Sequence, residues 1–386
     1  MYVSYQLNFS GGKKIMDLQE LRNEIDITDK EILSLFMKRM ELCKGVADYK
    51  KQHNMPVFQG GREKQVIDRI KSLTNDTALE NGTAALFTTI MDISKLLQNQ
   101  KLLSKNNEYN FSKPDFENTQ KIGCQGTSGA NSETASRMIF GDKKPVFYKS
   151  FEDVFRAVQS GEIDYGVIPL KNSTAGMIDS AYDLMAKYSV YIVKQICVEI
   201  NHCLAAKKGT SINDIKCVYS HPQALAQCSV FLAENNLETS AYSNTATAAG
   251  MVMESTENIA AICSVDCAER LGLEILAGNI ADCSVNKTQF VCIARDLQVS
   301  DDADTISIML QIPHTEGSLH RLLTKFYVNG TNLIRIENRP VRDGSFDVMF
   351  YLDFSGKLTD PSVRALMNDL SENMEYFRCS GTFRNE

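Results

Sequence analysis

The sequence predicts a multidomain protein with an all-α helical domain, an α/β domain and a small α+β module. Three observations predict this organisation. Residues 17–103 keep a helical spacing of apolar positions, residues 121–297 alternate short β-rich runs with helical ones, and residues 304–386 follow the order strand, helix, strand, strand, helix, strand. A polar tail (residues 1–16) precedes the helical domain, and a polar, Asn-containing linker (residues 104–120) follows it.

Composition and charge restrict the class of function. The chain has 386 residues, of which 43% are hydrophobic and 23% charged, as expected for folded domains. A net charge of -7 gives no general attraction to nucleic acid or to acidic membranes, so an anionic ligand needs a local cationic cluster. The eleven cysteines have no CxxC or metal-like spacing, which favours free thiols without disulfides or bound metal. Without a signal peptide or a long apolar run, we expect a cytoplasmic protein that does not span a membrane.

The first helix is predicted from Asp17 to about His53, a stretch without proline. Apolar residues follow a seven-residue repeat along it: Leu18, Ile25, Ile32 and Val46, with Leu21, Leu35, Leu42 and Tyr49 offset by three. At about 1.5 Å per residue the helix is roughly 50 Å long, too long to be covered by its own domain. We therefore expect an intertwined homodimer, or a tetramer built from it. Two further helices are predicted at residues 62–73 and 78–103.

Arg39 occupies one apolar position of the repeat, between Ile32 and Val46. A guanidinium there is costly unless an anion meets it. Lys50 projects within roughly 20° of the same direction, about 16 Å further along the helix, so the two cations can bind one small dianion. Ser94 and Gln98 share a face of the third helix. The other charged residues are, taken singly, equally compatible with a solvated surface.

Four segments in this order, LRNEID, KRMELCKGVADYK, GREKQVIDRI and MDISKLLQ, resemble the all-helical chorismate mutases over residues 17–100. The resemblance implies the rearrangement of chorismate to prephenate without a cofactor. Arginines would orient the two substrate carboxylates, while Lys50 and Gln98 would stabilise the charge that develops on the ether oxygen. It assigns catalytic roles to Arg39, Lys50 and Gln98, and substrate binding to Arg22 (reaching the pocket of the partner subunit), Gln59 (an aspartate in many relatives), Arg62, Glu63 and Ser94.

The α/β domain is predicted to contain a parallel or mixed sheet with crossover helices. Its expected strands are 145–148, 165–169, 190–193, 216–219 and 259–263. Several strand ends are followed by Ser, Thr, Asn or Gly at a helix start, where free N–H groups can bind carboxylates. Each junction alone is explained as well by helix capping, and His221 is equally compatible with a structural histidine.

Five motifs in this order, QGTSGANSETA, VIPLKNSTAG, SHPQALAQC, SNTATAAG and NKTQF, resemble the prephenate dehydratase domain over residues 121–295. The resemblance implies two α/β lobes around a cleft, similar to periplasmic binding proteins. It also implies conversion of prephenate to phenylpyruvate, with loss of carbon dioxide and the ring hydroxyl. Thr288 would be the catalytic residue at that hydroxyl, and the cleft would be lined by Asn172, Ser173, Ser220, His221, Gln223, Thr245 and Phe290.

Two positions depart from this family's pattern. Lys171 stands where relatives usually have Glu before Asn-Ser, and Gln289 where they have Arg between Thr and Phe. We include both among the candidate substrate-binding residues, with the hypothesis that the Lys171 ammonium binds the carboxylate in place of the missing arginine. An alternative is an active mutase with a degenerate dehydratase region that only binds prephenate or phenylalanine. A solute-binding protein with a helical dimerisation arm fits Arg39 and the absent signal peptide less well.

The C-terminal module is predicted to have a ferredoxin-like fold. Its expected strands are 306–312, 333–337, 346–353 and 376–381, with helices at 318–328 and 362–373. The segments at its first helix start and second strand end resemble the phenylalanine-binding ACT domain. The resemblance implies feedback inhibition by L-phenylalanine bound between paired modules, through Gly317, Ser318, Leu319, Glu337, Asn338, Arg339 and Pro340.

Overall fold

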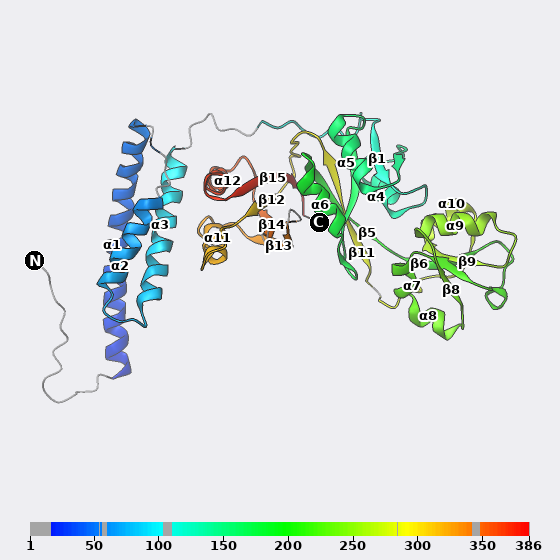
Figure 1. The fold of residues 1–386 in the computed structure, drawn as a ribbon, viewed down its shortest axis with the longest axis horizontal. Coiled ribbons are helices and arrows are strands. Elements are labelled where there is room, and N and C mark those ends of the chain that lie inside the picture. The colour runs from blue at the N-terminus through cyan, green and yellow to red at the C-terminus, as the bar shows by residue number, and fades with distance from the viewer. Residues whose placement is uncertain are drawn as a thin grey trace, which may run out of the picture. The chain divides into compact units, whose positions relative to one another are not determined.

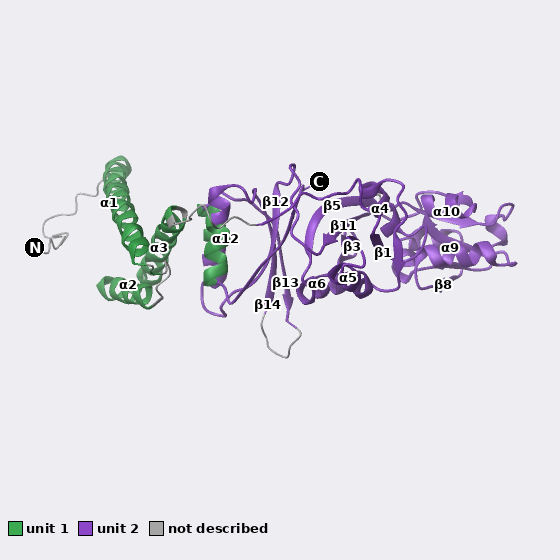
Figure 2. Cartoon of the chain, turned by 90° about the horizontal axis from the view of Figure 1, so that it is seen from above, with its two compact units in different colours: residues 1–107, 323–328, 365–373 green, residues 108–322, 329–364, 374–386 purple. Residues whose placement is uncertain are grey.

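The structure is a computed structural model that describes residues 17–53, 55, 60–102, 110–283, 285–341 and 348–385 (Figure 1). The chain divides into two compact units (Figure 2). The first contains residues 1–107, 323–328 and 365–373, and the second contains residues 108–322, 329–364 and 374–386. Among the described residues, no helix combines the length and the apolarity that crossing a lipid bilayer requires. All eleven cysteines are free thiols, which confirms the prediction of no disulfides.

The helical unit contains three long helices: α1 (Leu18–Gln52), α2 (Gly60–Leu73) and α3 (Glu80–Leu102). Helix α1 begins at a capping box, in which the Asp17 carboxylate accepts from the backbone N–H of Gln19 and Glu20, both at 2.8 Å. The Glu20 carboxylate accepts the Asp17 N–H in return, at 3.2 Å. The prediction of one uninterrupted helix across this segment is confirmed.

The apolar repeat of α1 is exposed in the single chain. The exposed fraction of its eight residues lies between 45% for Val46 and 67% for Leu35. Helix α1 buries a different set of side chains, Met40, Ala47 and Lys50, and it contacts α3 within the unit.

The larger unit begins with an α/β lobe whose sheet is mixed. Its elements are β1 (Ile122–Gln125), α4 (Asn131–Phe140), β2 (Val146–Tyr148), α5 (Phe151–Ser160), β3 (Tyr165–Asn172), β4 (Gly176–Met177), α6 (Asp179–Lys187), β5 (Tyr191–Glu199) and β11 (Lys287–Ala294). The strand order is β5-β11-β3-β1-β2, where β2, β1 and β3 are parallel and β11 runs antiparallel to β3 and β5. The predicted mixed sheet with crossover helices is therefore confirmed.

A second lobe is inserted between β5 and β11. It contains β6 (His202–Ala206), a 3-10 turn (Ile212–Asp214), β7 (Val218–Ser220), α7 (Pro222–Ala226), α8 (Ser229–Glu234), β8 (Thr239–Ala241), α9 (Thr245–Glu254), β9 (Ala260–Ser264), α10 (Val265–Leu271) and β10 (Glu274–Ala277). Its own sheet has the order β10-β6-β9-β7-β8. Each lobe buries its own apolar clusters, and the chain passes between the lobes twice, after β5 and before β11. A movement of one lobe relative to the other would therefore change the surroundings of the residues at these two crossings.

Residues 305–383 have the predicted ferredoxin-like order, and the segments 323–328 and 365–373 within them belong to the first compact unit. This part contains β12 (Thr305–Gln311), α11 (Ser318–Val328), β13 (Leu333–Pro340), β14 (Val348–Ser355), α12 (Pro361–Asn373) and β15 (Tyr376–Phe383). The antiparallel strand order β13-β14-β12-β15 is that of a βαββαβ sandwich. Strand β15 pairs with β5 in parallel at Gly381 and Ile192, so that this sheet continues into the first lobe.

We predict that Gly381→Ala destabilises this junction. A Cβ at Gly381 would lie 2.0 Å from the Ile192 carbonyl oxygen, and the residue has a φ of 140°. Overpacking against a backbone that cannot move away should cost about 1–3 kcal/mol. Calorimetry should show a lower unfolding midpoint for Gly381→Ala. The control is Gly250→Ala in α9, where a Cβ meets nothing within 4 Å and the midpoint should stay or rise. Equal midpoints for the two variants would contradict this account of the junction.

Candidate active sites

Arg39 is positioned by α1 so that its guanidinium contacts α3. Its Nη1 donates to the Ser94 hydroxyl at 2.6 Å and to the Ile90 carbonyl at 3.5 Å. The Ser94 hydroxyl donates to the same Ile90 carbonyl at 2.8 Å, which holds both polar groups in place. Within the described part of the chain Arg39 forms no ion pair with a carboxylate. Its half-buried charge is thus met by neutral oxygens, and an anionic ligand would compensate it.

Lys50 lies on the same helix as Arg39 and is buried, with 8% of its surface exposed. Burial lowers the pKa of its ammonium group, and the negative charge of Glu63 on α2 acts in the opposite direction. Glu63 itself is held by Lys95, whose Nζ lies 3.2 Å from the Glu63 carboxylate and 2.8 Å from that of Asp92. Burial also opposes the Lys95 charge, yet Asp92 and Glu63 raise its pKa. Sequence reasoning missed Lys95, although its spacing from Asp92 is that of a helical ion pair.

Gln98 lies one turn after Ser94 on α3 and is also buried. Its side-chain oxygen is without a hydrogen-bond partner among the described residues. A buried amide group without a partner costs about 1–3 kcal/mol, so this position favours a ligand or an ordered water. The helices therefore bring Arg39, Lys50, Glu63, Ser94 and Gln98 to one region between α1, α2 and α3. Arg22 and Arg62 remain on the exposed surface, and Gln59 lies outside the described residues.

In the two-lobed domain, the structure brings Asn172 and Thr288 together. They are register partners at the end of β3 and the start of β11, and Asn172 Nδ2 donates to Thr288 Oγ1 at 2.8 Å. Asn172 Oδ1 accepts from the backbone N–H groups of Thr174 and Ala175 at 3.0 and 2.9 Å. Ser173 ties the same two strand ends, because its hydroxyl accepts the Lys287 N–H at 2.9 Å.

Three residues that sequence reasoning did not single out surround this pair. Asn286 Oδ1 accepts from Asn172 at 2.9 Å, and Asn286 Nδ2 donates to Gln227 Oε1 at 3.1 Å. Gln227 Oε1 also lies 3.0 Å from Nε2 of the buried His202. Gln227 lies in the motif SHPQALAQC, and Asn286 is the first residue of the motif NKTQF. Their membership of these motifs was the sequence signal that could have identified them as site residues.

The structure corrects the predictions for Lys171 and Gln289. Successive strand residues point to opposite faces, so these cross-strand partners lie on the face opposite Asn172 and Thr288. The Lys171 ammonium pairs there with Glu337 of β13 at 3.3 Å. It therefore does not take up the position of a substrate-binding cation. Phe290 is corrected too, because it is 2% exposed and belongs to the apolar core of the first lobe.

The candidate residues of the second lobe have local structural roles in this arrangement. Ser220 is fully buried and donates to the Ile262 carbonyl at 2.6 Å. His221 caps α7 by accepting the Gln223 N–H at 3.3 Å, the capping interpretation that the sequence left open. Thr245 is the first residue of α9, which Asn244 caps. None of the hydrogen bonds of the described residues links these side chains to Thr288.

Four of the candidate regulatory residues line a cavity of about 550 Å³ in the ferredoxin-like part: Gly317, Ser318, Leu319 and Asn338. Glu337 and Arg339 point to the other face of β13. Glu337 meets Lys171, and the Arg339 guanidinium pairs with Asp179 and Asp183 of α6. Pro340 ends the strand and is outside the cavity lining. Strand β13 thus contacts a cavity on one side and the first lobe on the other.

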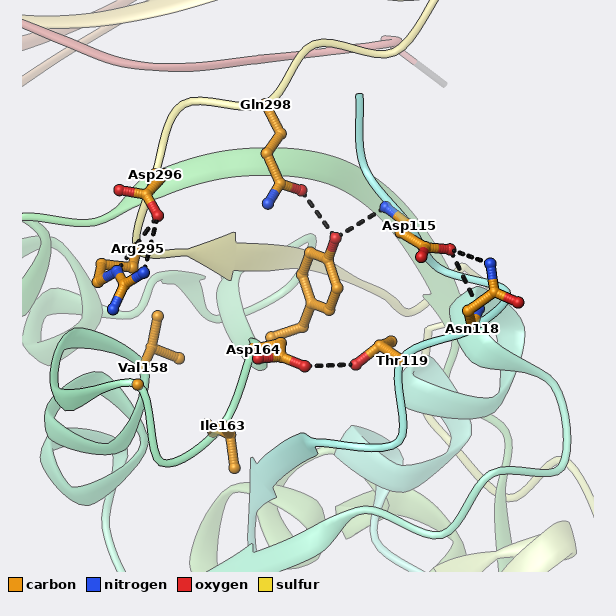
Figure 3. A pocket seen from close by; sticks show the side chains of 11 residues that line it. Asp115, Asn118, Thr119, Val158, Ile163, Asp164, Arg295, Asp296 and Gln298 are labelled. Carbon is orange, nitrogen blue, oxygen red and sulfur yellow. Dashed lines mark hydrogen bonds and ion pairs between the residues drawn. The ribbon is translucent and has the colours of Figure 1, made fainter. Parts of the chain in front are cut away.

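A second cavity, of about 390 Å³, lies at the opposite ends of β3 and β11 (Figure 3). None of the predicted site residues lines it. The Tyr165 hydroxyl donates to Gln298 at 2.8 Å and accepts the Asp115 N–H at 2.9 Å, while Arg295 pairs with Asp296 at 3.1 Å. Because the lining side chains bond to one another, we interpret this region as the anchor of residues 115–119 on the sheet.

Comparison with known proteins matches both enzyme regions. Residues 21–99 match the family model of chorismate mutase type II, and residues 122–298 match that of prephenate dehydratase. The bifunctional chorismate mutase/prephenate dehydratase of Stutzerimonas stutzeri is 30% identical, over 95% of this chain and 97% of the relative. Arogenate dehydratase/prephenate dehydratase 1, a chloroplastic protein of Arabidopsis thaliana, is 34% identical, over 81% of this chain and 83% of the relative.

A solved structure is similar to the larger unit. The prephenate dehydratase of Arthrobacter aurescens in complex with L-Phe aligns with a TM-score of 0.63 and 28% identity, over 68% of this chain and 89% of that chain. The two domain matches follow each other in one chain, and the Stutzerimonas relative is matched along nearly its whole length. The chain therefore belongs to the bifunctional chorismate mutase/prephenate dehydratase family.

Proposed function

We propose that this chain rearranges chorismate to prephenate in its helical unit and converts prephenate to phenylpyruvate in its two-lobed domain, in the synthesis of L-phenylalanine. The observation that carries the proposal is that one chain holds two sets of hydrogen-bond donors suited to an anionic substrate. Arg39 and Lys50 are shielded cations with no carboxylate on Arg39, and Thr288 is a hydroxyl oriented by Asn172. Both substrates are dicarboxylates that such donors can hold.

The mutase reaction requires the protein to orient the substrate and to stabilise the charge that develops on its ether oxygen. It does not require a nucleophile from the protein. Arg39 fixes one carboxylate so that the flexible substrate adopts its reactive shape, and Lys50 faces the ether oxygen as its bond breaks. Burial lowers the pKa of Lys50, so the ammonium gains from any negative charge that forms beside it. Gln98 offers a buried amide at the same site.

We predict that Lys50→Ala reduces the mutase kcat by about 10²–10³, the range for removal of one donor at a developing oxyanion. The measurement is chorismate consumption by the purified full chain. Lys51→Ala is the control, because Lys51 is the exposed neighbour on the same helix. Prephenate turnover by the same chain reports that the protein is intact. Mutase turnover of Lys50→Ala equal to that of the parent would exclude this site.

The dehydratase step uses the orientation of Thr288. Its hydroxyl oxygen accepts the Asn172 amide, and among the hydrogen bonds of the described residues its own proton has no acceptor. The proton is therefore directed to a ligand, where it can protonate the leaving ring hydroxyl. The bond to the ring carboxylate breaks and carbon dioxide leaves, its electron pair enters the ring, and the ring hydroxyl leaves as water with the Thr288 proton, which a proton from solvent replaces. Because Lys171 and Gln289 lie on the other sheet face, they provide no reason to favour the degenerate alternative.

We further propose that the exposed repeat of α1 pairs two chains into an intertwined dimer or a tetramer built from it. Arg22 is exposed near the start of the helix and would reach the pocket of the partner subunit. The eight apolar residues of the repeat would then be buried between chains, in agreement with their exposure in the single chain.

Leu35→Asp should separate the subunits, because it places a charge on the most exposed residue of the repeat. Sedimentation velocity should show a smaller species, and mutase turnover should fall at least about tenfold because each site loses its partner arginine. Lys30→Asp, which adds a carboxylate outside the repeat, is the matched control. A Leu35→Asp protein of parental mass and activity would rule out this interface.

The ferredoxin-like part is proposed to act as an ACT domain that binds L-phenylalanine and inhibits the dehydratase. Asn338 faces the cavity of about 550 Å³, while its neighbours Glu337 and Arg339 contact Lys171 and α6. Lys171 precedes Asn172 directly, so a shift of β13 on ligand binding would reach the catalytic strand through one ion pair. This contact supplies the differential interaction that an allosteric effect requires.

Glu337→Gln should weaken feedback rather than phenylalanine binding. We expect the phenylalanine concentration for half inhibition to rise by about fivefold, since a coupling free energy of roughly 1 kcal/mol corresponds to such a factor. Phenylalanine affinity, measured by calorimetry, should change less. Lys171→Gln should have the same effect, and the double variant should add nothing further. Independent, additive effects of the two variants would contradict coupling through this pair.

A further inference from the structure

Four side chains near Thr288 close a ring of hydrogen bonds. Gln227 Nε2 donates to Thr174 Oγ1 at 2.5 Å, and Thr174 Oγ1 donates to Asn172 Oδ1 at 2.7 Å. Asn172 Nδ2 donates to Asn286 Oδ1 at 2.9 Å, and Asn286 Nδ2 donates to Gln227 Oε1 at 3.1 Å. Every member is uncharged, so the ring places no ion in the protein interior.

The direction of donation in this ring is fixed by the backbone. Asn172 Oδ1 accepts from two backbone N–H groups, and Asn172 Nδ2 donates to the Lys287 carbonyl at 3.3 Å. The Asn172 amide therefore has one orientation. Its two N–H groups are directed to Thr288 and Asn286 at the shorter distances, and the longer contact with the Lys287 carbonyl shares one of them. Asn286 consequently turns its own N–H to Gln227, whose oxygen must be the acceptor on that side.

His202 completes the arrangement from behind Gln227. Its Nε2 lies 3.0 Å from Gln227 Oε1, and because that oxygen accepts, Nε2 must carry the hydrogen. Nδ1 is buried without a partner among the described residues. Burial lowers the pKa of His202, which favours the neutral ring that this geometry requires. The imidazole is thus a fixed donor to the Gln227 amide.

The ring also joins the two lobes. Asn172 ends β3 of the first lobe and Thr174 follows it, while His202 begins β6 and Gln227 caps α7 in the second lobe. Asn286 lies on the returning crossing, just before β11. Separating the lobes would remove Gln227 from both Thr174 and Asn286. The same hydrogen bonds therefore hold the two lobes together and orient the side chains around Thr288.

We propose that His202 and Asn286 are positioning residues of the dehydratase. They hold the Gln227 amide in the orientation that joins the two lobes. In this arrangement Asn172 donates to the Thr288 oxygen, so the Thr288 proton is directed to the substrate. Neither residue needs to touch prephenate. The inference rests on the proposed dehydratase function and adds the reason why Thr288, whose oxygen accepts from Asn172, presents its proton to the substrate.

The test compares two amides at position 202. The amide nitrogen of His202→Gln falls near the position of imidazole Nε2 and can donate to Gln227, whereas that of His202→Asn falls near Nδ1 and cannot. For His202→Asn we expect the prephenate kcat to fall about tenfold or more with KM changed less than about threefold, as for lost transition-state orientation. His202→Gln should stay within about threefold of the parent on the same scale.

Asn286→Asp provides a second variant that does not depend on the histidine. It keeps the acceptor for Asn172 and places a carboxylate oxygen against Gln227 Oε1, so kcat should fall as for His202→Asn. Mutase turnover and the thermal transition of each variant report folding. The inference is overturned if His202→Gln and His202→Asn have equal kcat, or if Asn286→Asp keeps the parental value. A parent chain with mutase activity and no prephenate turnover would instead refute the dehydratase function itself.

Discussion

The register between β3 and β11 is the constraint on which the dehydratase region depends. It pairs Asn172 with Thr288 on one face of the sheet and Lys171 with Gln289 on the other. A shift by one residue would exchange these faces and turn Lys171 toward Thr288. The register is held where the strands end, by Ser173 and Lys287 exchanging hydrogen bonds through the Ser173 N–H and hydroxyl. The face on which Thr288 lies and the face from which Lys171 contacts the ferredoxin-like part are therefore set by the same pairing.

Much of the fold follows from patterns that act locally. The capping residue Asp17 and the absence of proline predict α1, and the βαββαβ order of the last part follows from alternating β-rich and helical runs. Asn172 and Thr288 were also predicted, because each stands in a recognisable motif. Lys171 was misassigned because its face depends on a strand that joins the sheet more than a hundred residues later. Sequence spacing gives no information on such long-range register.

The ring around Gln227 illustrates a second limit of sequence reasoning. Its members come from the end of β3, the end of α7 and the second crossing, His202 of β6 supports it, and only tertiary structure brings these segments together. Phe290 shows the converse, since a residue inside a functional motif serves the core. In the helical unit the pattern was more informative. A charge inside an apolar repeat has few structural explanations, and Arg39 does contact Ser94 on α3.

The polar contacts of the larger unit are of two kinds, and their chemistry matches their position. Near Thr288 they are neutral amides and hydroxyls, whose strength depends on direction and changes little with salt. Between β13 and the first lobe they involve charged side chains. Lys171 pairs with Glu337, Arg339 pairs with Asp179 and Asp183, and Arg335 donates to the Tyr182 hydroxyl. Partly exposed ion pairs are weak, tolerant of geometry and screened by salt. Catalysis requires one fixed orientation, whereas regulation requires contacts that break at small free-energy cost. The division of neutral and charged contacts across β3 satisfies both requirements in adjacent residues.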